Sequence, residues 1–508
     1  MRRSALVWVL ALVGTMAATA VSVAELYDTP TKVQTYADAI ATDALVAVNG
    51  RVEGLDTLGG IVQDEFGFLA AFLMPLLGVG LVTAATRREE ESGRLEQLLA
   101  GRVDRRAPVL ASLVVVVVTV VVTMVGFAVS LVAAGVPTEG SVLYSLSLGA
   151  LALVFAALAA LLAQVVLHAR AVYGVALAVL AVAYVFRGVG DVRGWWVVWL
   201  SPLGWAERTA PFGEPRWWVL LVPLVVAVLL AGAAVVLAAR RDLGSALWRG
   251  GAGPERASTL LQRPLGLAWA LQRGSFVGWL VGSTVLAAVM GSLAQEVVDA
   301  LTGNPALEVY ISLGDDPADG FLAMVVLYLA ILGIGYVVQA LGILRQEETE
   351  GRLEPQLAGT VARTRWLGAH LGVVLAGLVV ILGASSAVLG LTSASVTGVG
   401  SVWPVVGAGL AYVPAVIVVA GLAAALFGLL PRGYVAAWGV FGGVTFIAFL
   451  GAGLQMPQWL LDVSPTTHVG TPPQGDVSGV ALAVLVVVAA ALTAAGVVGF
   501  RRRDVPRG

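Results

Sequence analysis

Cysteine is absent from this 508-residue chain, and lysine occurs once, at Lys32. Without cysteine the chain forms no disulfide, thiolate metal site or cysteine nucleophile. The three histidines, His168, His370 and His468, lie far apart in sequence and form no helical pair, so we expect no zinc site. The pattern Gly-x-x-x-x-Gly-Lys-Ser/Thr that cradles a nucleotide phosphate is missing too, because Lys32 lies in TPTKVQT. These absences predict a chain that is not an enzyme and holds no cofactor of its own.

Charge is also scarce, since Asp, Glu, Lys and Arg make up 12% of the residues, whereas a soluble globular protein carries about 25%. Hydrophobic residues make up 59%, and the mean hydropathy is +0.91. Runs such as VLASLVVVVVTVVVTMVGFAVSLVAA exceed the roughly 20 residues that cross a bilayer as a helix. The sequence therefore predicts an all-α polytopic membrane protein surrounded by lipid.

The chain repeats itself at an offset of 258 positions that grows to 262 and 263 toward the end of each half. Gly93-Arg94-Leu95-Glu96 returns 258 positions later as Gly351-Arg352-Leu353-Glu354, and ARRDLG at Ala239 returns as RRRDVP at Arg501. HARAVYGV likewise matches LPRGYVAA, and LSPLGW matches VSPTTH. Such self-similarity indicates an ancient tandem duplication. We expect two pseudo-symmetric six-helix halves, at 1–244 and 273–508, joined by a cytoplasmic linker and interfacial helix at 245–272.

About twelve transmembrane helices are expected, six in each half. The apolar runs place them at 5–24, 66–86, 107–134, 142–167, 171–187, 217–238, 274–294, 320–343, 366–392, 404–430, 433–451 and 477–499. The first run, Ala5 to Val23, also resembles a signal peptide, but its length favours an uncleaved span. Two pairs of longer segments, following the first and fifth spans of each half, are expected on the outside as short surface helices and a tryptophan-rich break in the outer leaflet.

Arginine placement predicts the orientation. With both termini inside, the cytoplasmic segments hold 24 of the 30 Lys and Arg residues, as expected for a multi-pass protein of the plasma membrane. The outside keeps six: Lys32, Arg51, Arg187, Arg193, Arg208 and Arg216. Both GRLE stretches are then cytoplasmic.

The charged stretch RREEESGRLEQLLAGRVDRR carries eleven charges in twenty residues. EEESGRLEQLLAG predicts one short amphipathic helix, with Leu95, Leu98 and Leu99 on one face. A single copy is explained by topology alone, but topology does not require Gly-Arg-Leu-Glu twice in fixed order. We expect a duplicated docking element, held in shape by the pairs Arg94–Glu96 and Arg352–Glu354.

These stretches, together with SPLGWAERTAPFGEPRWW and GFRRRD, resemble the permease subunits of ABC-type exporters. In particular, they resemble the fused twelve-span permeases of actinobacteria that export polyketide antibiotics such as tetronasin. The resemblance implies export of hydrophobic or amphiphilic compounds, driven by two copies of a separate ATPase that carries ATP and Mg²⁺. It implies ATPase-coupling roles for Glu90, Gly93, Arg94, Leu95, Glu96, Leu99, Arg170, Glu348, Gly351, Arg352, Leu353, Glu354, Leu357 and Arg432. Pro355 replaces Gln97 and departs from strict equivalence of the two docking helices.

The resemblance also implies a pathway between the halves, lined by the second and fifth spans of each. Candidate lining residues are Phe68, Phe72, Met74, Tyr173, Tyr184, Met324, Tyr328, Tyr336, Trp438 and Phe441. Their apolar character suits a hydrophobic small-molecule cargo and no nucleic acid. Two other functions stay open. An ion-driven secondary transporter normally carries an ionisable residue inside the membrane, and the predicted span interiors are nearly free of charge. A non-transporting membrane scaffold is the other alternative.

Overall fold

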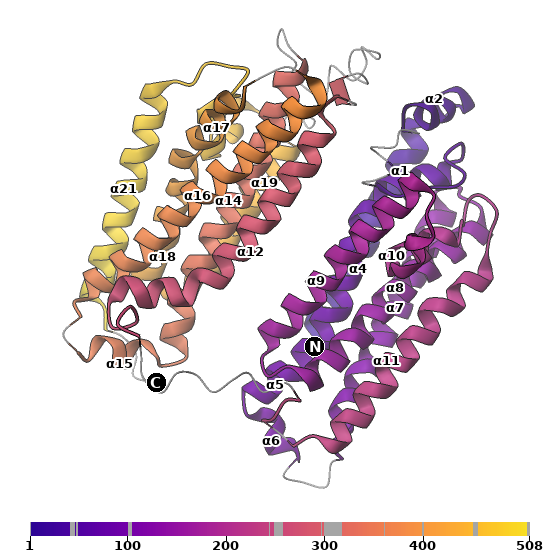
Figure 1. Ribbon diagram of the computed structural model, residues 1–508, viewed down its shortest axis with the longest axis horizontal. Helices are drawn as coiled ribbons and strands as arrows, with labels where there is room; N and C mark the ends of the chain where they lie inside the picture. Colours follow the sequence, from indigo (N-terminus) through magenta and orange to yellow (C-terminus); the bar gives the residue numbers. More distant parts are fainter. Residues whose placement is uncertain are drawn as a thin grey trace. The chain divides into compact units, whose positions relative to one another are not determined.

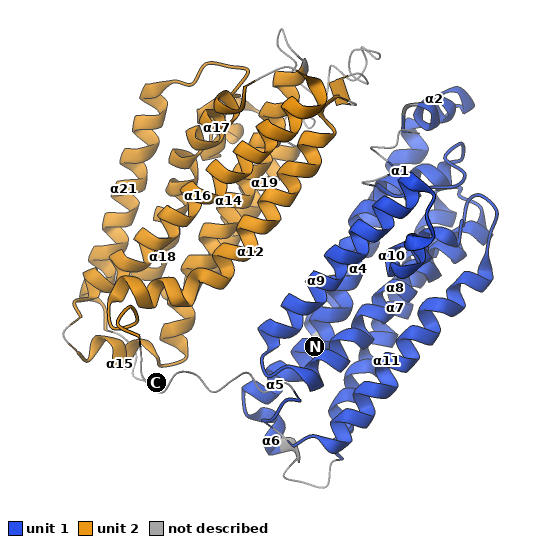
Figure 2. Cartoon of the chain, in the orientation of Figure 1, with its two compact units in different colours: residues 1–253 blue, residues 254–508 orange. Residues whose placement is uncertain are grey.

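The computed structural model describes residues 2–40, 46, 49–99, 104–242, 244–247, 258–295, 297–298, 317–359, 361–398, 401–450 and 456–504. These residues form helices and turns, with no strand among them. The chain divides into two compact units, residues 1–253 and 254–508 (Figure 2). Within the described ranges, twelve helices are long and apolar enough to cross a membrane, which agrees with the all-α polytopic prediction.

The first unit holds six of these helices (Figure 1). They are α1 (Arg2–Leu26), α4 (Leu58–Ala85), α7 (Ala107–Ala133), α8 (Thr138–Val165), α9 (Ala169–Arg193) and α11 (Leu221–Arg240). Shorter elements are α2 (Pro30–Ile40), α5 (Arg87–Glu91), α6 (Arg94–Leu99), η1 (Trp196–Leu200), α10 (Pro202–Arg208) and η2 (Trp217–Leu220). Helix α4 begins eight residues before its predicted start, because the Thr57 side chain accepts the Gly60 N–H at 3.0 Å and caps the helix there.

The second unit repeats this plan. Its long helices are α12 (Pro264–Ser292), α14 (Pro317–Thr349), α16 (Arg363–Thr397), α17 with α18 (Val402–Ala411 and Val413–Leu429), α19 (Val435–Leu450) and α21 (Gly479–Arg502). Shorter elements are α15 (Leu353–Leu357), η4 (Pro431–Gly433), α20 (Gln458–Leu461) and η5 (Pro465–Val469). The predicted domain boundary at 272/273 falls inside α12, which runs unbroken from Pro264 to Ser292, and the two compact units divide at 253/254. The interfacial position expected for the segment before residue 273 stays a prediction.

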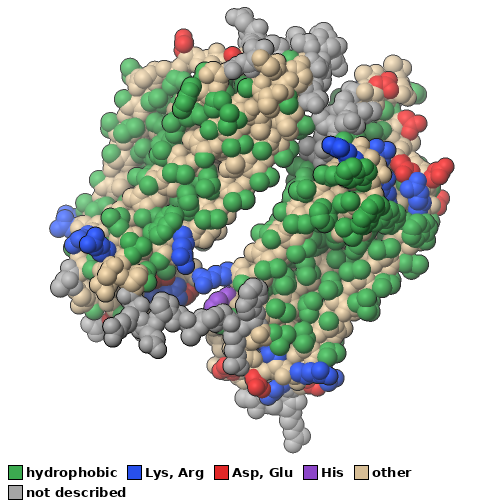
Figure 3. Space-filling model, viewed as in Figure 1, with side chains coloured by type: hydrophobic (Ala, Val, Ile, Leu, Met, Phe, Trp, Pro, Cys, Tyr) green, Lys and Arg blue, Asp and Glu red, His purple; other side chains and the backbone are tan. Residues whose placement is uncertain are grey.

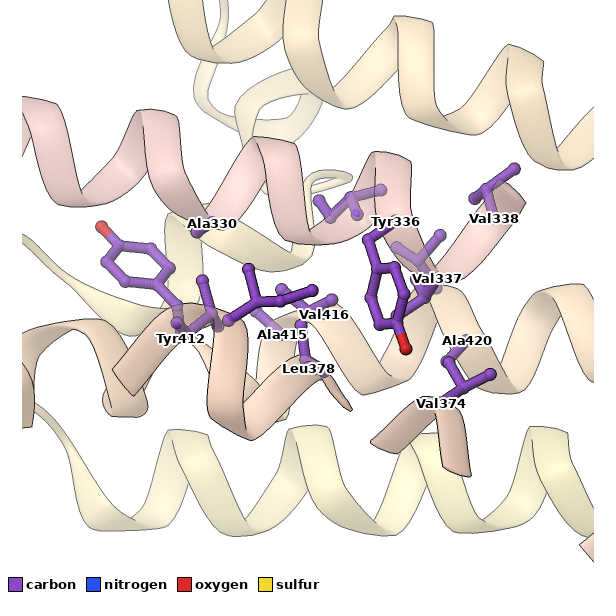
Figure 4. Close-up of a cluster of buried hydrophobic side chains, with 14 of the residues drawn as sticks. Ala330, Tyr336, Val337, Val338, Val374, Leu378, Tyr412, Ala415, Val416 and Ala420 are labelled. Atoms are coloured by element: carbon purple, nitrogen blue, oxygen red, sulfur yellow. The ribbon is translucent and has the colours of Figure 1, made fainter. Parts of the chain in front are cut away.

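The most buried span of the first unit is the fourth, α8, whereas that of the second unit is the second, α14. Helix α8 packs against α4, α7 and α11, and α18 packs against α14 and α21. The core of the second unit is formed by side chains of α14, α16 and α18, among which Tyr336, Leu378 and Val416 meet (Figure 4). Hydrophobic side chains cover the flanks of both units, while charged side chains gather toward the helix ends (Figure 3). This distribution is the one that a bilayer imposes.

Small residues allow the central helices to approach closely. A Cβ at Gly78 would lie 2.4 Å from the Ala152 carbonyl oxygen of α8, and one at Gly428 would lie 2.0 Å from the Gly496 carbonyl oxygen of α21. Both neighbours are backbone atoms, which cannot rotate away. Glycine at these positions therefore sets the distance between the helices, as is common in membrane bundles.

We predict that Gly428→Val lowers the free energy of unfolding by roughly 1–3 kcal/mol or more, since the added side chain forces α18 away from α21. Gly439→Val in α19 is the matched control, because a Cβ there meets no atom within 4 Å. Thermal unfolding of both variants in detergent is the measurement. Equal melting temperatures would contradict the close approach of α18 and α21.

Candidate functional site

The two GRLE stretches lie at corresponding ends of the two units, but neither forms one continuous helix. Gly93 has φ +72° and separates α5 from α6, and Gly351 has φ +70° and separates α14 from α15. Glycine adopts this left-handed conformation without steric cost, whereas other residues are strained there. The predicted single helix over EEESGRLEQLLAG is therefore wrong, because each glycine turns the chain before a second short helix begins.

A buried carboxylate fixes the first stretch to the end of α11. The Glu90 oxygens accept hydrogen bonds from Arg241 Nη1 at 3.0 Å and Arg241 Nη2 at 2.8 Å, and the Arg87 guanidinium lies 2.9 Å away. The Gly244 N–H donates to the same carboxylate at 2.8 Å. Arg87 also donates to the carbonyl oxygens of Val166 and Ser245, at 2.8 and 3.0 Å. We call Arg87, Glu90 and Arg241 the first clamp.

The second unit builds the same arrangement from Arg345, Glu348 and Arg503, the second clamp. Arg503 donates through both Nη atoms to Glu348, with Nη2 at 3.0 Å, and Arg345 lies 3.1 Å from the same carboxylate. Arg345 and Glu348 follow Arg87 and Glu90 by 258 positions. The Arg503 guanidinium also lies over the rings of Phe427 and Phe500, at 5.1 and 5.3 Å. The repeated sequence contains both partners of this contact, the glutamate before GRLE and the arginine of ARRD or RRRD. Their pairing in the folded chain was not predicted.

The clamps change the roles expected for the residues that are identical in the two copies of the repeat. Glu348 is buried, and the side chain of Glu90 is only 6% exposed. Both carboxylates are engaged inside their own units, so they position the loop and present little surface to a partner. Leu95 and Leu353 are buried as well, and Leu357 is half-buried. Leu99 ends α6, and its side chain lies outside the described residues.

Arginine and glutamate of each GRLE point to solvent. The Arg94 side chain is 69% exposed and that of Arg352 is 50% exposed, and Glu96 and Glu354 are exposed beside them. The expected Arg94–Glu96 and Arg352–Glu354 pairs are wrong. Arg94 instead lies 3.6 Å from Glu89, and Arg352 lies 2.7 Å from Glu347, which is the same contact 258 positions later. Glu96 lies on α6 and Glu354 on α15, and both side chains are exposed to solvent.

The second loop is held more tightly than the first. Glu347 is buried, and besides Arg352 it accepts a hydrogen bond from Gln356 at 2.9 Å, which in turn accepts one from Trp366 at 2.7 Å. The hydrogen bond with Glu347 raises the pKa of Arg352, so its positive charge is secure. Pro355 is the third residue of α15, in the first turn, where a missing N–H costs nothing. The departure from the repeat is therefore compatible with the short helix.

The smaller loops carry the exposed Arg170 and Arg432 next to tyrosine anchors. Arg170 lies in the first turn of α9, whose Ala169 N–H donates to Glu91 at 2.9 Å, and Arg432 lies in η4. Tyr173 donates to the Gly80 carbonyl at 3.5 Å, and Tyr434 donates to the Val338 carbonyl at 2.7 Å. The second and fifth long helices of both units are thus tied at one equivalent point.

The predicted pathway residues differ in burial. Met74 and Tyr336 are fully buried in the cores of their own units, so they pack helices together and line no open surface. Phe68 and Trp438 are exposed. The other six are half-buried: Phe72, Tyr173, Tyr184, Met324, Tyr328 and Phe441. Aromatic contacts join the second and fifth long helices of each unit, Phe72 with Tyr184 at 5.3 Å and Tyr328 with Phe449 at 4.6 Å.

Buried charges also lie at the opposite end of the first unit. Arg187 lies 3.5 Å from Glu207, and Arg208 lies 2.7 Å from Asp191. Burial raises the pKa of Glu207 well above its usual range. These groups were expected outside the membrane near span ends, but α9 continues to Arg193 and brings Arg187 and Asp191 against α10. The i, i+4 spacing of Arg187 and Asp191 is the signal that could have indicated one buried face.

We predict that Glu90→Gln and Glu348→Gln each lower the free energy of unfolding by about 3–5 kcal/mol, because a buried guanidinium loses its compensating charge. Amide hydrogen exchange should accelerate in residues 87–99 and 345–357 respectively. Glu96→Gln is the control, since Glu96 is exposed on the same loop. If Glu90→Gln exchanges and melts like Glu96→Gln, the clamp does not hold the loop.

The sequence of this chain is similar to that of known efflux permeases. The family model described as "Multidrug efflux system permease Rv1217c, C-terminal domain" matches residues 1–237 and again residues 261–501. The chain is also 36% identical over 459 residues to the multidrug efflux system permease protein Rv1217c of Mycobacterium tuberculosis (strain ATCC 25618 / H37Rv), covering 88% of this chain and 84% of that protein. Because the match extends across both units, this multi-pass membrane protein belongs to the Rv1217c family of multidrug efflux system permeases.

Proposed function

We propose that the chain is the transmembrane subunit of an ATP-driven ABC exporter that moves hydrophobic or amphiphilic compounds, including polyketide antibiotics of the tetronasin type, out of the cell. ATP and Mg²⁺ belong to a separate ATPase. Family membership supports drug export. The coupling to an ATPase is supported by one observation above all, the repeated clamp that presents a short helix with outward Arg and Glu side chains in each unit.

In each GRLE stretch some side chains anchor the loop to its unit, and others are free to contact a partner. The leucine and the preceding clamp glutamate are buried, whereas the arginine and the final glutamate are exposed. A mere topology signal needs arginines but no buried anchor. A loop that must transmit force to the spans needs both an exposed contact and a stiff connection. The clamps give that connection, since α5 is tied to α11, and the end of α14 is tied to the residue after α21.

Two anchored loops suit two equivalent sockets, so we propose one permease chain with two ATPase copies. Both loops then lie in the cytoplasm, which places both termini inside and the tryptophan-rich segments outside. Arg170 and Arg432 are further contacts on neighbouring loops. The half-buried aromatic residues of the second and fifth helices support an apolar cargo, which aromatic and aliphatic side chains bind through burial.

We predict that Arg94→Glu with Arg352→Glu abolishes ATPase co-purification while insertion and expression stay near wild type. An exposed ion pair contributes only about 0–1 kcal/mol to folding, so the fold should survive. A charge desolvated at an interface is different, and its loss costs roughly 2–5 kcal/mol of binding. The measurement is co-purification of the tagged chain with its ATPase.

The control is Lys32→Glu, which reverses an exposed cation of α2 outside both GRLE loops. Single reversals should be unequal, because Arg352 is held by a buried Glu347 and Arg94 by a partly exposed Glu89. A double variant that still co-purifies and exports a hydrophobic dye like wild type would reduce the stretch to a topology signal.

We also predict that export in proteoliposomes requires the ATPase and ATP, and that a protonophore leaves it unchanged. An ion-driven carrier is the second candidate, favoured by the burial of Asp64 in α4, where Tyr36 and Asn49 donate to it at 2.9 and 3.1 Å. Dye uptake into inverted vesicles separates the two. Uptake by the isolated chain under an imposed proton gradient, without ATP, would establish the carrier instead.

A further inference from the structure

Each unit carries an apolar groove beside its Ser-Pro segment. The first groove has about 530 Å³ of free volume and lies among α8, α9 and α11. Its lining is entirely apolar and includes Phe155, Ala178, Phe186 and Leu200. No side chain in it offers a hydrogen bond, so a polar ligand would be bound there at a cost.

The second groove lies among α18, α21 and η5 and has about 350 Å³ of free volume. It is lined by Val418, Val463, Pro465, His468 and residues of α21 between Ala481 and Val488, so its lining is apolar apart from one imidazole. Val463 and Pro465 follow the first groove's Leu200 and Pro202 by 263 positions, and Val488 follows Val226 by 262. The Ser-Pro segment and the sixth long helix therefore form corresponding walls in both grooves, whereas α9 lines only the first groove and no described residue of α19 lines the second.

The surroundings of the grooves indicate what fills them. Val182 lines the first groove and Val484 the second, and both are exposed, as are Leu229 and Val487 on the adjoining faces of α11 and α21. In a multi-pass membrane protein such faces contact lipid tails. Each groove is thus continuous with the surface that borders the hydrocarbon, and a ligand reaches it from the bilayer without crossing the core.

A group of exposed tryptophans, the tryptophan belt, lies beside the Ser-Pro end of the first groove, and a single exposed tryptophan lies beside that of the second. Trp196, Trp199 and Trp218 are exposed next to Leu200, and Trp199 stacks on Trp218 at 5.8 Å. In the second unit the exposed Trp459 precedes Val463. Tryptophan settles at the level of the lipid headgroups. Each groove consequently runs from headgroup depth into the hydrocarbon, the direction in which an acyl chain lies.

The first groove also has a cation at its headgroup end. Arg193 is exposed, ends α9, and follows the groove residue Phe186 by seven positions, which places both on one helix face. Its guanidinium lies 5.4 Å from the Trp195 ring. An exposed guanidinium at this depth complements a phosphate.

We propose that each groove binds one acyl chain of a membrane phospholipid, whose headgroup rests beside the exposed tryptophans and, in the first unit, against Arg193. The acyl chain fills the space between the Ser-Pro segment and the long helices that line the groove. The site is distinct from the GRLE loops, and it does not depend on any ATPase.

The test uses the full chain in lipid nanodiscs that contain phosphatidylglycerol with a diazirine on its acyl chain, without ATPase or nucleotide. After illumination, peptide mapping should find label in 174–186, 226–230 and 481–488 severalfold above the exposed face of α1. Ala178→Phe should remove label from the first groove only, and Ala481→Phe from the second only. Arg193→Gln should weaken labelling of the first groove alone.

The matched control is Gly14→Phe in α1, where a Cβ meets no atom within 4 Å. Should Ala178→Phe fail to fold, Gly174→Leu fills the same groove. A Cβ at Gly174, as at Gly14, meets no atom within 4 Å. Label spread evenly over all lipid-facing helices and unchanged by the groove-filling variants would overturn the proposal. Labelling of the grooves by a diazirine-bearing hydrophobic drug, and not by the lipid, would make them cargo sites and would equally refute it.

Discussion

A glutamate buried between two arginines is the interaction on which each half depends. Burying a carboxylate is costly unless its charge and its lone pairs are satisfied, and removing either partner leaves an expensive charge behind. Glu90 and Glu348 meet this condition with a bidentate arginine from the end of the sixth long helix and a second arginine one turn before them. Since this contact fixes the start of the loop, it decides which side chains of α6 and α15 reach the solvent.

The two units share more than the clamp. A tyrosine of the fifth helix donates to the matching carbonyl of the second helix in each, and an apolar groove lies below each Ser-Pro segment. At the opposite end the first unit buries the ion pairs Arg187–Glu207 and Asp191–Arg208. The parts that both units share are the ones expected to meet duplicated partners or the common lipid.

The clamps also bear on how an ATPase could drive export through this chain. A permease that is driven by a separate subunit must transmit motion from an exposed loop to its spans. A loop attached to the spans only by its two ends would bend and would not transmit that motion. Side chains that anchor the loop are buried, and side chains free to contact a partner are charged. The exposed tryptophans beside the two Ser-Pro segments are of the kind that settles at the level of the lipid headgroups.

The sequence by itself determined the helical class, the twelve spans, the duplication and the position of the charged stretches, because hydrophobic length and self-similarity are one-dimensional signals. It also named Leu95 and Leu353 but could not say that they are buried. Contacts between distant segments required the tertiary structure: Glu90 meets Arg241, 151 positions away, and Arg94 meets Glu89 instead of Glu96. The breaks at Gly93 and Gly351 were missed because a positive φ leaves no mark in the pattern of apolar residues. Burial of Met74, Tyr336 and the charges around Glu207 likewise depended on which helix packs against which, and sequence periodicity does not contain that information.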